Sequence, residues 1–371
     1  MTTKYYSIVA RYSFIFERIS DNNKQVSMDI STTPRKIVTY PIGSVPKAGA
    51  VFLFGKTEAP RLVLMCAGYP DDHTNFLPFA SRLAVEADCL VGVTCLPGYD
   101  DRDDHRYTDN PVDGYSFQDM VTAIREAVYI LRAESTVDSA KLIGIFHDWG
   151  VLSGSMHTNH MLEVADNQFL TPDRIVLLDV LGPPHPDTEK QNTIPIDARR
   201  DTMYETVVTL SYRIVLAKAF AIRRYISKTL AQIYAGFAFT ALGLLRMSPT
   251  MDIDAQALKQ QRKVPLSLDR MLYMAYPYFN AFKATLKGTI QQEFRGMHLP
   301  KDLCKTPVLY MYGTEKRIMF HDRRALKMLE EEQEKGRSKS KAVKVEGAGH
   351  WLYLQQQDLC LKEVKQFVMD A

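Results

Sequence analysis

The sequence has few features of the protein classes that depend on cysteine pairs, extreme charge or glycine-rich phosphate loops. Its five cysteines are scattered and include no CxxC pair, so we expect reduced, mostly buried thiols. Lysine and arginine (46) barely outnumber aspartate and glutamate (43), and so weak a net charge gives little affinity for nucleic acid. The motifs GxGxxG, GxxxxGK[ST] and HExxH are absent, which leaves dinucleotide, P-loop and zinc-protease sites without support.

Long uncharged apolar runs are also scarce. One such run, 229–245, is 17 residues long and has basic residues on both sides (Arg223, Arg224, Lys228 and Arg246). Since this length is the lower limit for a membrane-spanning helix, we favour a buried or interfacial helix of a lid, and a peripheral membrane contact through 229–245 stays open. Met1–Ser20 has only short apolar bursts between charged residues. This pattern argues against a secretory signal, and we expect a cytoplasmic protein, with or without membrane association.

The chain is long enough for one large α/β domain with an insertion. It has 371 residues, 46% of them apolar, so its core needs no metal or disulfide for stability. Short apolar runs alternate with segments of helical periodicity, which is typical of βαβ units and a mostly parallel sheet. The expected strands are 51–54, 62–66, 90–95, 142–146, 175–178, 308–312 and 342–345. The expected helices are 75–87, 116–132, one following Gly150, 323–334 and one at the C-terminus.

The alternation is interrupted between Pro183 and His298, where several helical stretches occur without a clear strand. We therefore expect a central sheet flanked by helices, with a helical cap inserted after the sixth main strand. The predicted division is 1–182 for the first part of the core, 183–298 for the cap and 299–371 for the second part of the core.

A candidate nucleophile follows the expected strand 142–146. The apolar strand runs into His147-Asp148-Trp149-Gly150, and a helix begins at once. This is the strand–turn–helix pattern of a nucleophile elbow, with Asp148 in place of serine. The tight turn would lift the carboxylate off the sheet, and the helix N-terminus favours a negative charge there. A helix-capping Asp after a strand is the alternative interpretation of this position alone.

Two further motifs favour the elbow over the cap. Gly347-Ala348-Gly349-His350-Trp351 places a histidine in a glycine-rich turn after the last strand, which fits the chain order of nucleophile, acid and base. Ala67-Gly68-Tyr69-Pro70 follows the third strand, and its turn can present the backbone N–H of Tyr69. With the N–H of Trp149, this predicts a two-donor oxyanion hole.

Together these motifs resemble the α/β-hydrolase fold, and within it the branch of epoxide hydrolases and haloalkane dehalogenases. The resemblance rests on His147-Asp148-Trp149-Gly150, on Gly68-Tyr69-Pro70 and on Gly349-His350. It covers 61–184 and 306–371, whereas the insertion matches only in position and helical character. The sequence departs from the family's pattern at Phe146, where a small residue is usual, and at Ala67, where a histidine is usual.

The resemblance also implies an acid that orients His350. Many relatives place it a few residues after the strand 308–312, where this sequence has Lys316 at the position expected for Asp. The other position used in this fold is the end of the preceding strand, which Asp179 occupies. A buried acid there needs a partner, and a histidine is a suitable one. We favour Asp179, with Glu315 and Asp322 as alternatives; Asp322 also fits a helix cap.

The resemblance implies that Asp148 attacks a saturated carbon and that water activated by His350 hydrolyses the resulting alkyl ester. Epoxide opening also needs acids, which this family takes from cap tyrosines. We favour Tyr212 and Tyr278, the latter because Tyr278-Phe279-Asn280 resembles the family's second tyrosine segment. The expected substrate is a small apolar epoxide, and we expect no cofactor and no metal.

Other functions stay open as alternatives. Dehalogenation needs N–H donors around a halide, yet both tryptophans, Trp149 and Trp351, lie outside the insertion and Tyr69 replaces a side-chain amide donor. An inactive hydrolase scaffold that binds a lipid or a protein partner through its cap is the alternative from another class. The acidic loop Asp100–His105 contains arginines and is interpreted as a solvated polar loop rather than a metal site. The sequence gives no oligomeric state.

Overall fold

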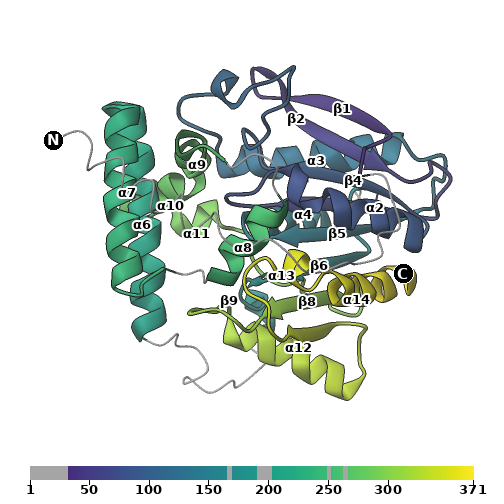
Figure 1. The fold of residues 1–371 in the computed structure, drawn as a ribbon. Helices are drawn as coiled ribbons and strands as arrows, with labels where there is room; N and C mark the ends of the chain where they lie inside the picture. Colours follow the sequence, from purple (N-terminus) through teal and green to yellow (C-terminus); the bar gives the residue numbers. More distant parts are fainter. Residues whose placement is uncertain (1–31, 165–168, 190–202, 249–251, 262–265) are drawn as a thin grey trace.

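The computed structural model of the protein describes residues 32–164, 169–189, 203–248, 252–261 and 266–371 (Figure 1). Met1–Ser20, on which the expectation about a secretory signal rests, lies outside the described residues. Parts of the predicted cap region also lie outside them, so the helices below are those of the described segments.

An eight-stranded sheet has the order β1-β2-β4-β3-β5-β6-β8-β10. β1 pairs antiparallel with β2 and β2 with β4, whereas the remaining pairings within this sheet are parallel. The mostly parallel sheet confirms the predicted α/β class. The strands are β1 (Lys36–Ile42), β2 (Val45–Phe54), β3 (Arg61–Ala67), β4 (Cys89–Cys95), β5 (Lys141–His147), β6 (Arg174–Leu178), β8 (Val308–Gly313) and β10 (Lys341–Val345); β7 (Val180–Leu181) and β9 (Phe320–His321) form a separate parallel pair.

Each expected strand overlaps an observed one, but β1 was not expected from the sequence. Among the described strands it lies at the edge of the sheet and pairs with β2, and several of its side chains are exposed. It also contains Pro41, which cannot donate a backbone hydrogen bond. Proline and exposed polar residues are tolerated at sheet edges, and they remove the continuous apolar run by which the central strands were recognised.

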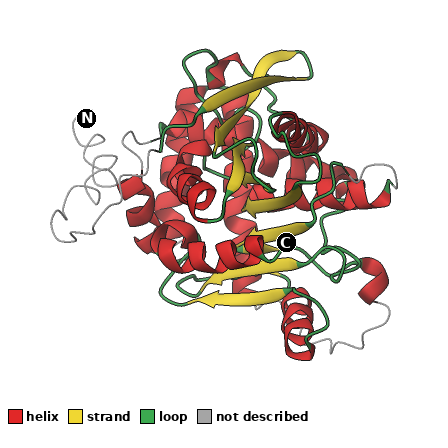
Figure 2. Cartoon of the chain, turned by 90° about the vertical axis from the view of Figure 1, so that its right-hand side faces the viewer, coloured by secondary structure: helices red, strands yellow, loops and turns green. Residues whose placement is uncertain are grey.

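Helices cover both faces of the sheet (Figure 2). Because successive side chains of a strand point to opposite faces, Leu62, Leu64 and Cys66 of β3 enter one core cluster, while Val63 and Met65 enter the other. The first cluster includes residues of α3 (Phe117–Ala133) and α4 (Trp149–Glu163); the second includes residues of α2 (Leu77–Glu86) and α14 (Gln357–Met369). The short helices η1 (His73–Phe76), η2 (Tyr107–Asp109) and α13 (Leu352–Gln355), and the longer α12 (Arg323–Lys335), complete the core.

A helical cap follows β6, the sixth strand of the main sheet, as predicted. Its helices are α5 (Pro186–Glu189), α6 (Met203–Tyr225), α7 (Lys228–Leu244), α8 (Asp252–Gln261), α9 (Leu268–Met274), α10 (Tyr276–Lys287) and α11 (Ile290–Glu293). α6 and α7 pack side by side as a long hairpin at one side of the molecule, and α6 also packs on α10 (Figure 1). None of the helices in the described segments combines the length and the apolar character needed to cross a bilayer.

The parallel strands bring distant segments of the chain to one edge. The carboxyl ends of β3, β5, β6, β8 and β10 point the same way, and the segments that follow them carry Tyr69, Asp148, Asp179, Lys316 and His350. Ligand sites of open α/β sheets lie at this edge. The topology therefore brings these five residues to one edge of the sheet.

Candidate active site

Asp148 lies at the tip of a sharp turn between β5 and α4. Its backbone has φ 52° and ψ −124°, a conformation that is strained for a residue other than glycine and that is concentrated at functional sites. The turn is packed tightly on β3, because a Cβ at Gly150 would lie 2.4 Å from the carbonyl oxygen of Cys66. The side chain of Asp148 is 16% exposed. The carboxylate is thus held above the sheet and stays accessible.

Two glycines accommodate Phe146, the large residue that stands where the family has a small one. Its ring is buried, and it occupies the space that a Cβ at Gly144 or at Gly154 would need, at 2.5 Å in each case. The bulky ring therefore fits because two neighbouring positions, one on the same strand and one on α4, are glycines and have no side chain. This departure leaves the elbow geometry intact.

His350 lies between two carboxylates. Its Nε2 is 3.4 Å from Oδ2 of Asp148, and its Nδ1 is 2.5 Å from Oδ2 of Asp179. Asp179 also has a positive φ, 66°, and is completely buried. The three side chains thus contact one another in the order Asp148, His350, Asp179, which is the order expected for a nucleophile, a base and an orienting acid.

The charges of this cluster support one another. Burial by itself would lower the pKa of His350, but the hydrogen bonds and charges of Asp148 and Asp179 raise it above its ordinary value. Burial pushes the pKa of Asp148 upward, yet His350 and the N–H of Trp149 outweigh that effect and lower it. Asp179 behaves alike, with Lys316 as the main group that opposes burial. At neutral pH the resting site therefore holds an ionised Asp148 beside a protonated His350.

The predicted oxyanion donors both point at Asp148. The backbone N–H of Tyr69 donates to Oδ1 of Asp148 at 2.7 Å, and the N–H of Trp149 contributes a second backbone hydrogen bond. Gly68 makes this approach possible, since a Cβ there would lie 2.2 Å from the nitrogen of Trp149. Ala67 at the position of the family's usual histidine leaves these backbone donors unchanged.

The two cap tyrosines singled out in the sequence lie near Asp148. The ring of Tyr278 packs edge-on against Tyr69 at 5.2 Å and against Trp149 at 5.1 Å, and Tyr212 lies 6.0 Å from Tyr278. Burial raises the pKa of Tyr278 well above its usual value, and the charge of Asp148 raises it further. Burial also raises the pKa of Tyr212, although Arg213 opposes this. Both hydroxyls therefore carry their protons at neutral pH.

The two alternative acids lie elsewhere. The side chain of Asp322 accepts from the backbone N–H groups of Arg324 and Ala325 at the start of α12, which is the helix-cap role considered above. Glu315 is exposed, and its backbone N–H donates to Ala348. Lys316, at the position expected for an acid, forms an ion pair with Asp179 through fully buried side chains.

Two supporting carboxylates were not found from the sequence. Asp71 accepts from the indole N–H of Trp351 at 2.6 Å and so connects the oxyanion turn to the residue after the base. Asp254 of α8 accepts the backbone N–H of His350 at 2.8 Å. The pair Asp71-Asp72 after the oxyanion turn could have signalled the first, but no local pattern marks Asp254 as a neighbour of His350.

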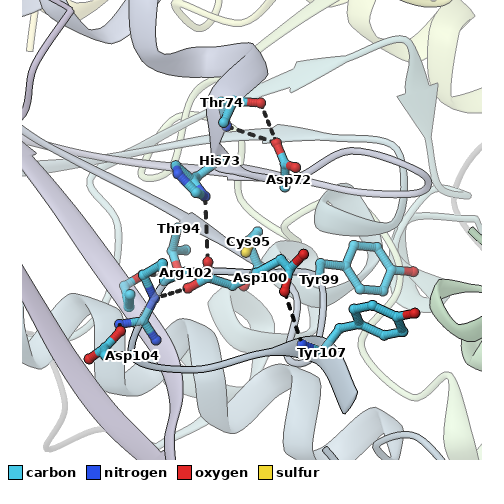
Figure 3. Close-up of polar contacts among 12 residues, drawn as sticks. Asp72, His73, Thr74, Thr94, Cys95, Tyr99, Asp100, Arg102, Asp104 and Tyr107 are labelled. Atoms are coloured by element: carbon cyan, nitrogen blue, oxygen red, sulfur yellow. Dashed lines mark hydrogen bonds and ion pairs between the residues drawn. The ribbon is translucent and has the colours of Figure 1, made fainter. Parts of the chain in front are cut away.

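The acidic loop after β4 forms an arginine-neutralised network (Figure 3). Asp100 is buried and pairs with Arg102, while His73 lies 3.9 Å from its other oxygen. Arg102 also binds Asp104 at 3.0 Å. Within the described chain, we find no group of His, Cys, Asp and Glu residues arranged to hold a metal ion.

Comparisons with known proteins identify the fold of the chain. The sequence matches no family model and no curated protein. Solved structures do match: a candidate epoxide hydrolase from Klebsiella pneumoniae is 16% identical with a TM-score of 0.51, and the match covers 91% of this chain and 99% of that one. The protein DBJA is 15% identical with a TM-score of 0.51, covering 89% and 97%. Epoxide hydrolase VrEH1 from Vigna radiata is 16% identical with a TM-score of 0.47, covering 92% and 100%. At these identities the likeness concerns the fold, and the two structures with a TM-score of 0.51 confirm the predicted one.

Proposed function

We propose that this chain, which has the α/β-hydrolase fold, is a hydrolase that opens apolar epoxides through a covalent ester on Asp148. The observation that carries the proposal is the contact of His350 with both Asp148 and Asp179. A carboxylate at an elbow, with a base and an orienting acid behind it, is the arrangement that a two-step displacement and hydrolysis needs.

In the first step, an oxygen of Asp148 attacks a ring carbon and the carbon–oxygen bond of the epoxide breaks. The oxygen that leaves takes a proton from Tyr278 or Tyr212. Both tyrosines lie near enough to Asp148 that its negative charge raises their pKa. An alkoxide is more basic than a tyrosinate, so this transfer is favourable even though burial raises the pKa of both hydroxyls. The proton of His350 then restores the tyrosine, directly or through water, and leaves the imidazole neutral.

In the second step, neutral His350 takes a proton from water, and the resulting hydroxide attacks the carbonyl carbon of the ester. The negative oxygen that forms lies where Oδ1 of Asp148 now accepts from Tyr69, so the backbone N–H groups stabilise it. The bond to the alkyl oxygen breaks and that oxygen takes the proton of His350. The new carboxyl group of Asp148 gives its proton back to His350, which restores the starting ion pair.

The surroundings of Asp148 favour an epoxide over a haloalkane. The indole N–H of Trp149 is hydrogen-bonded to Tyr278 and is therefore engaged instead of being free for a halide. That bond also leaves the hydroxyl proton of Tyr278 available for an oxygen. The aromatic rings of Tyr69 and Trp149 both pack against the ring of Tyr278 beside the carboxylate, which suits a small apolar substrate.

A single turnover in heavy-oxygen water tests the covalent mechanism. With enzyme in excess over styrene oxide, the first-turnover diol should be mostly unlabelled, while the peptide that contains Asp148 gains the label. The product oxygen comes from Asp148 and the carboxylate is rebuilt from water. Label in the first-turnover diol would contradict the ester. An absence of turnover and of any adduct across a panel of epoxides and alkyl halides would favour the inactive scaffold.

A membrane-surface contact of the α6–α7 hairpin is the second part of this proposal. Half of the large apolar side chains that are exposed anywhere in the described chain lie within 203–245, far more than a scattered surface pattern would give. On α7 they follow helical spacing, and we call this set the α7 stripe: Leu230, Ile233, Phe237 and Leu244.

Charge supports a bilayer as the occupant of this surface. Between 203 and 248 the chain has six basic residues and one acidic residue, Glu205, and Glu205 is paired with Arg323. Exposed Lys228 and Arg246 lie at the two ends of α7. An uncharged apolar stripe with cations at both ends fits a surface of anionic phospholipid, where apolar side chains enter the headgroup boundary. An enzyme placed there would receive substrates that partition into lipid.

A further inference from the structure

The mechanism above makes no use of Lys316, yet this residue contacts the catalytic cluster. Its ammonium is bonded to Oδ1 of Asp179, and both side chains are completely buried. Lysine is seldom buried fully unless it is paired, and separating buried ions from their partners is costly. The position of this cation beside the orienting acid therefore calls for a functional account as well as a structural one.

The carboxylate of Asp179 is shared between two partners. Oδ2 accepts from Nδ1 of His350 at 2.5 Å, whereas Oδ1 accepts from Lys316 and from the backbone N–H of Gly313 at 3.1 Å. In a three-residue arrangement without the lysine, the whole charge of the acid would act on the imidazole. Here an ammonium neutralises that charge from the other side.

The charges add up differently before and after ester formation. With Asp148 ionised and His350 protonated, the four groups Asp148, Asp179, Lys316 and His350 sum to zero. Once Asp148 is esterified, Lys316 and Asp179 cancel each other, so a proton on His350 leaves these four groups with a net positive charge in a buried site. Such a charge is unfavourable, and the imidazole becomes neutral at the stage where it must accept a proton.

We propose that Lys316 is a positioning residue that weakens the hold of Asp179 on the proton of His350, so that the base is free while Asp148 is esterified. This inference rests on the proposed function for its role in hydrolysis. The contact itself is independent of that function, and one of the two measurements below needs no substrate.

Two histidines and a tyrosine near the cluster keep it free of further charge changes near neutral pH. Burial lowers the pKa of His147 to about 3 and that of His321 to about 4, so both are neutral there. Burial raises the pKa of Tyr310, which donates toward His321, well above its usual value. Asp254 accepts the backbone N–H of His350 and so contacts the backbone of that residue instead of its imidazole. Only Asp148 loses its charge when the ester forms.

Histidine titration by NMR tests the inference without catalysis. Asp148→Asn gives the neutral side chain that the ester would have, and the signal of His350 is compared between D148N, D148N/K316M and D148N/K316R. Removing the cation should raise the titration midpoint of His350 by about one pH unit or more, while Arg, which keeps the charge, should leave it within a few tenths. Equal midpoints in all three proteins would overturn the inference.

The pH profile of ester hydrolysis tests the role in the reaction. In single turnovers of wild type, Lys316→Met and Lys316→Arg, the decay of the Asp148 ester is followed by the mass of its peptide. In K316M the acid limb should move to higher pH by about one unit, so that below it the ester decays about tenfold more slowly, because the neutral base is correspondingly rarer. K316R should restore the wild-type limb.

The outcomes separate the two proposals. If wild type forms no ester, the proposed function fails, and the NMR comparison still decides the effect of Lys316. If wild type forms the ester and K316M only slows decay equally at every pH, the lysine is merely structural and the inference is wrong. Thermal unfolding of each variant identifies any that fail to fold, in which case Lys316→Gln replaces Met in both measurements.

Discussion

The carboxyl edge of the sheet buries charged side chains, whereas the outer face of α7 exposes apolar ones. At the sheet edge, charged groups such as Asp179 and Lys316 are buried and each has a partner. On α7, apolar side chains such as Phe237 and Leu244 are exposed, and the helix from Thr229 onward has no charge at all. Both arrangements are costly in an isolated soluble domain.

The difference shows which function would offset the unfavourable free energy of each region. Buried ions fixed by neighbours are pre-organised, which suits chemistry in which charge moves between a few atoms. An exposed apolar stripe gains its stabilisation only when something covers it, which suits attachment. The predictions below separate the two regions, since changes at the sheet edge should alter chemistry and changes on α7 should alter location.

Removing the nucleophile or the base should have the largest effect. Asp148→Asn should lower turnover by about 10⁴- to 10⁶-fold, whereas His350→Gln should still form the ester and accumulate it, because attack by Asp148 does not need the base. Mass spectrometry of the Asp148 peptide with an epoxide in excess measures the adduct. Normal turnover of either variant would contradict the assignment of the catalytic site to the sheet edge.

Asp179→Asn should slow ester hydrolysis by about 10²- to 10⁴-fold. It should also lower the free energy of unfolding by about 3–5 kcal/mol, because Lys316 loses its buried partner. The double variant D179N/K316M should recover stability in a thermal melt without recovering activity. Glu315→Gln is the matched control and should behave as wild type; if Glu315→Gln is the slow variant instead, the acid is misassigned.

The α7 stripe should control attachment to lipid. The triple variant L230S/I233S/F237S should reduce sedimentation with phosphatidylserine-containing vesicles by about 100-fold or more, since each buried large side chain is worth about 1.5–3 kcal/mol. Turnover of a water-soluble epoxide should be unchanged. Val85→Ser, an exposed apolar position on α2, is the control.

Other occupants of the stripe give different results in that experiment. Absence of vesicle binding in wild type, together with a concentration-dependent dimer that the triple variant abolishes, would identify a second copy of the chain. Binding that is equal for neutral and anionic vesicles would contradict the role of Lys228 and Arg246.

Losing a cap hydroxyl should have an intermediate effect on chemistry. Tyr278→Phe and Tyr212→Phe should each slow ring opening by about tenfold to hundredfold, because the remaining hydroxyl still supplies a proton, and the double variant should be slower than either. Burst kinetics of ester formation measure this step separately from hydrolysis. Tyr225→Phe, on the exposed end of α6, is the control; an effect as large as that of Tyr278→Phe would point to packing instead.

The smallest expected effect is a change in stability at a glycine that packs against Phe146. Alanine at a helical glycine usually stabilises by about 0.5–1 kcal/mol, and Gly236→Ala on α7, with open space around it, should do so. Gly154→Ala should instead destabilise by about 1–3 kcal/mol, because its Cβ meets the buried ring. Chemical denaturation of the two variants gives the comparison, and the same sign for both would contradict the packing described at the elbow.

Much of this molecule was predictable because its signals are local. The buried strands appear as continuous apolar runs, and the N-cap Ser116 and Asp322 mark the starts of α3 and α12. The elbow at Asp148 and the turn at His350 were visible as short motifs. β1 was missed because an edge strand buries only part of its surface. The fit of Phe146 was missed because only the folded structure places Gly144 and Gly154 against its ring, where they leave it room.

The amino-acid sequence by itself determined the order of the elements and the place of the insertion, and it marked Asp148 and His350 as the candidate nucleophile and base, since each of these depends on residues close together in the chain. It left three acids open for His350 and assigned Lys316 no role. Only the tertiary structure decided which carboxylate reaches the imidazole, and that Lys316 pairs with it. Those contacts join the ends of β6, β8 and β10, and such proximity depends on the order of the strands in the sheet, which is a property of the whole fold and not of a local motif.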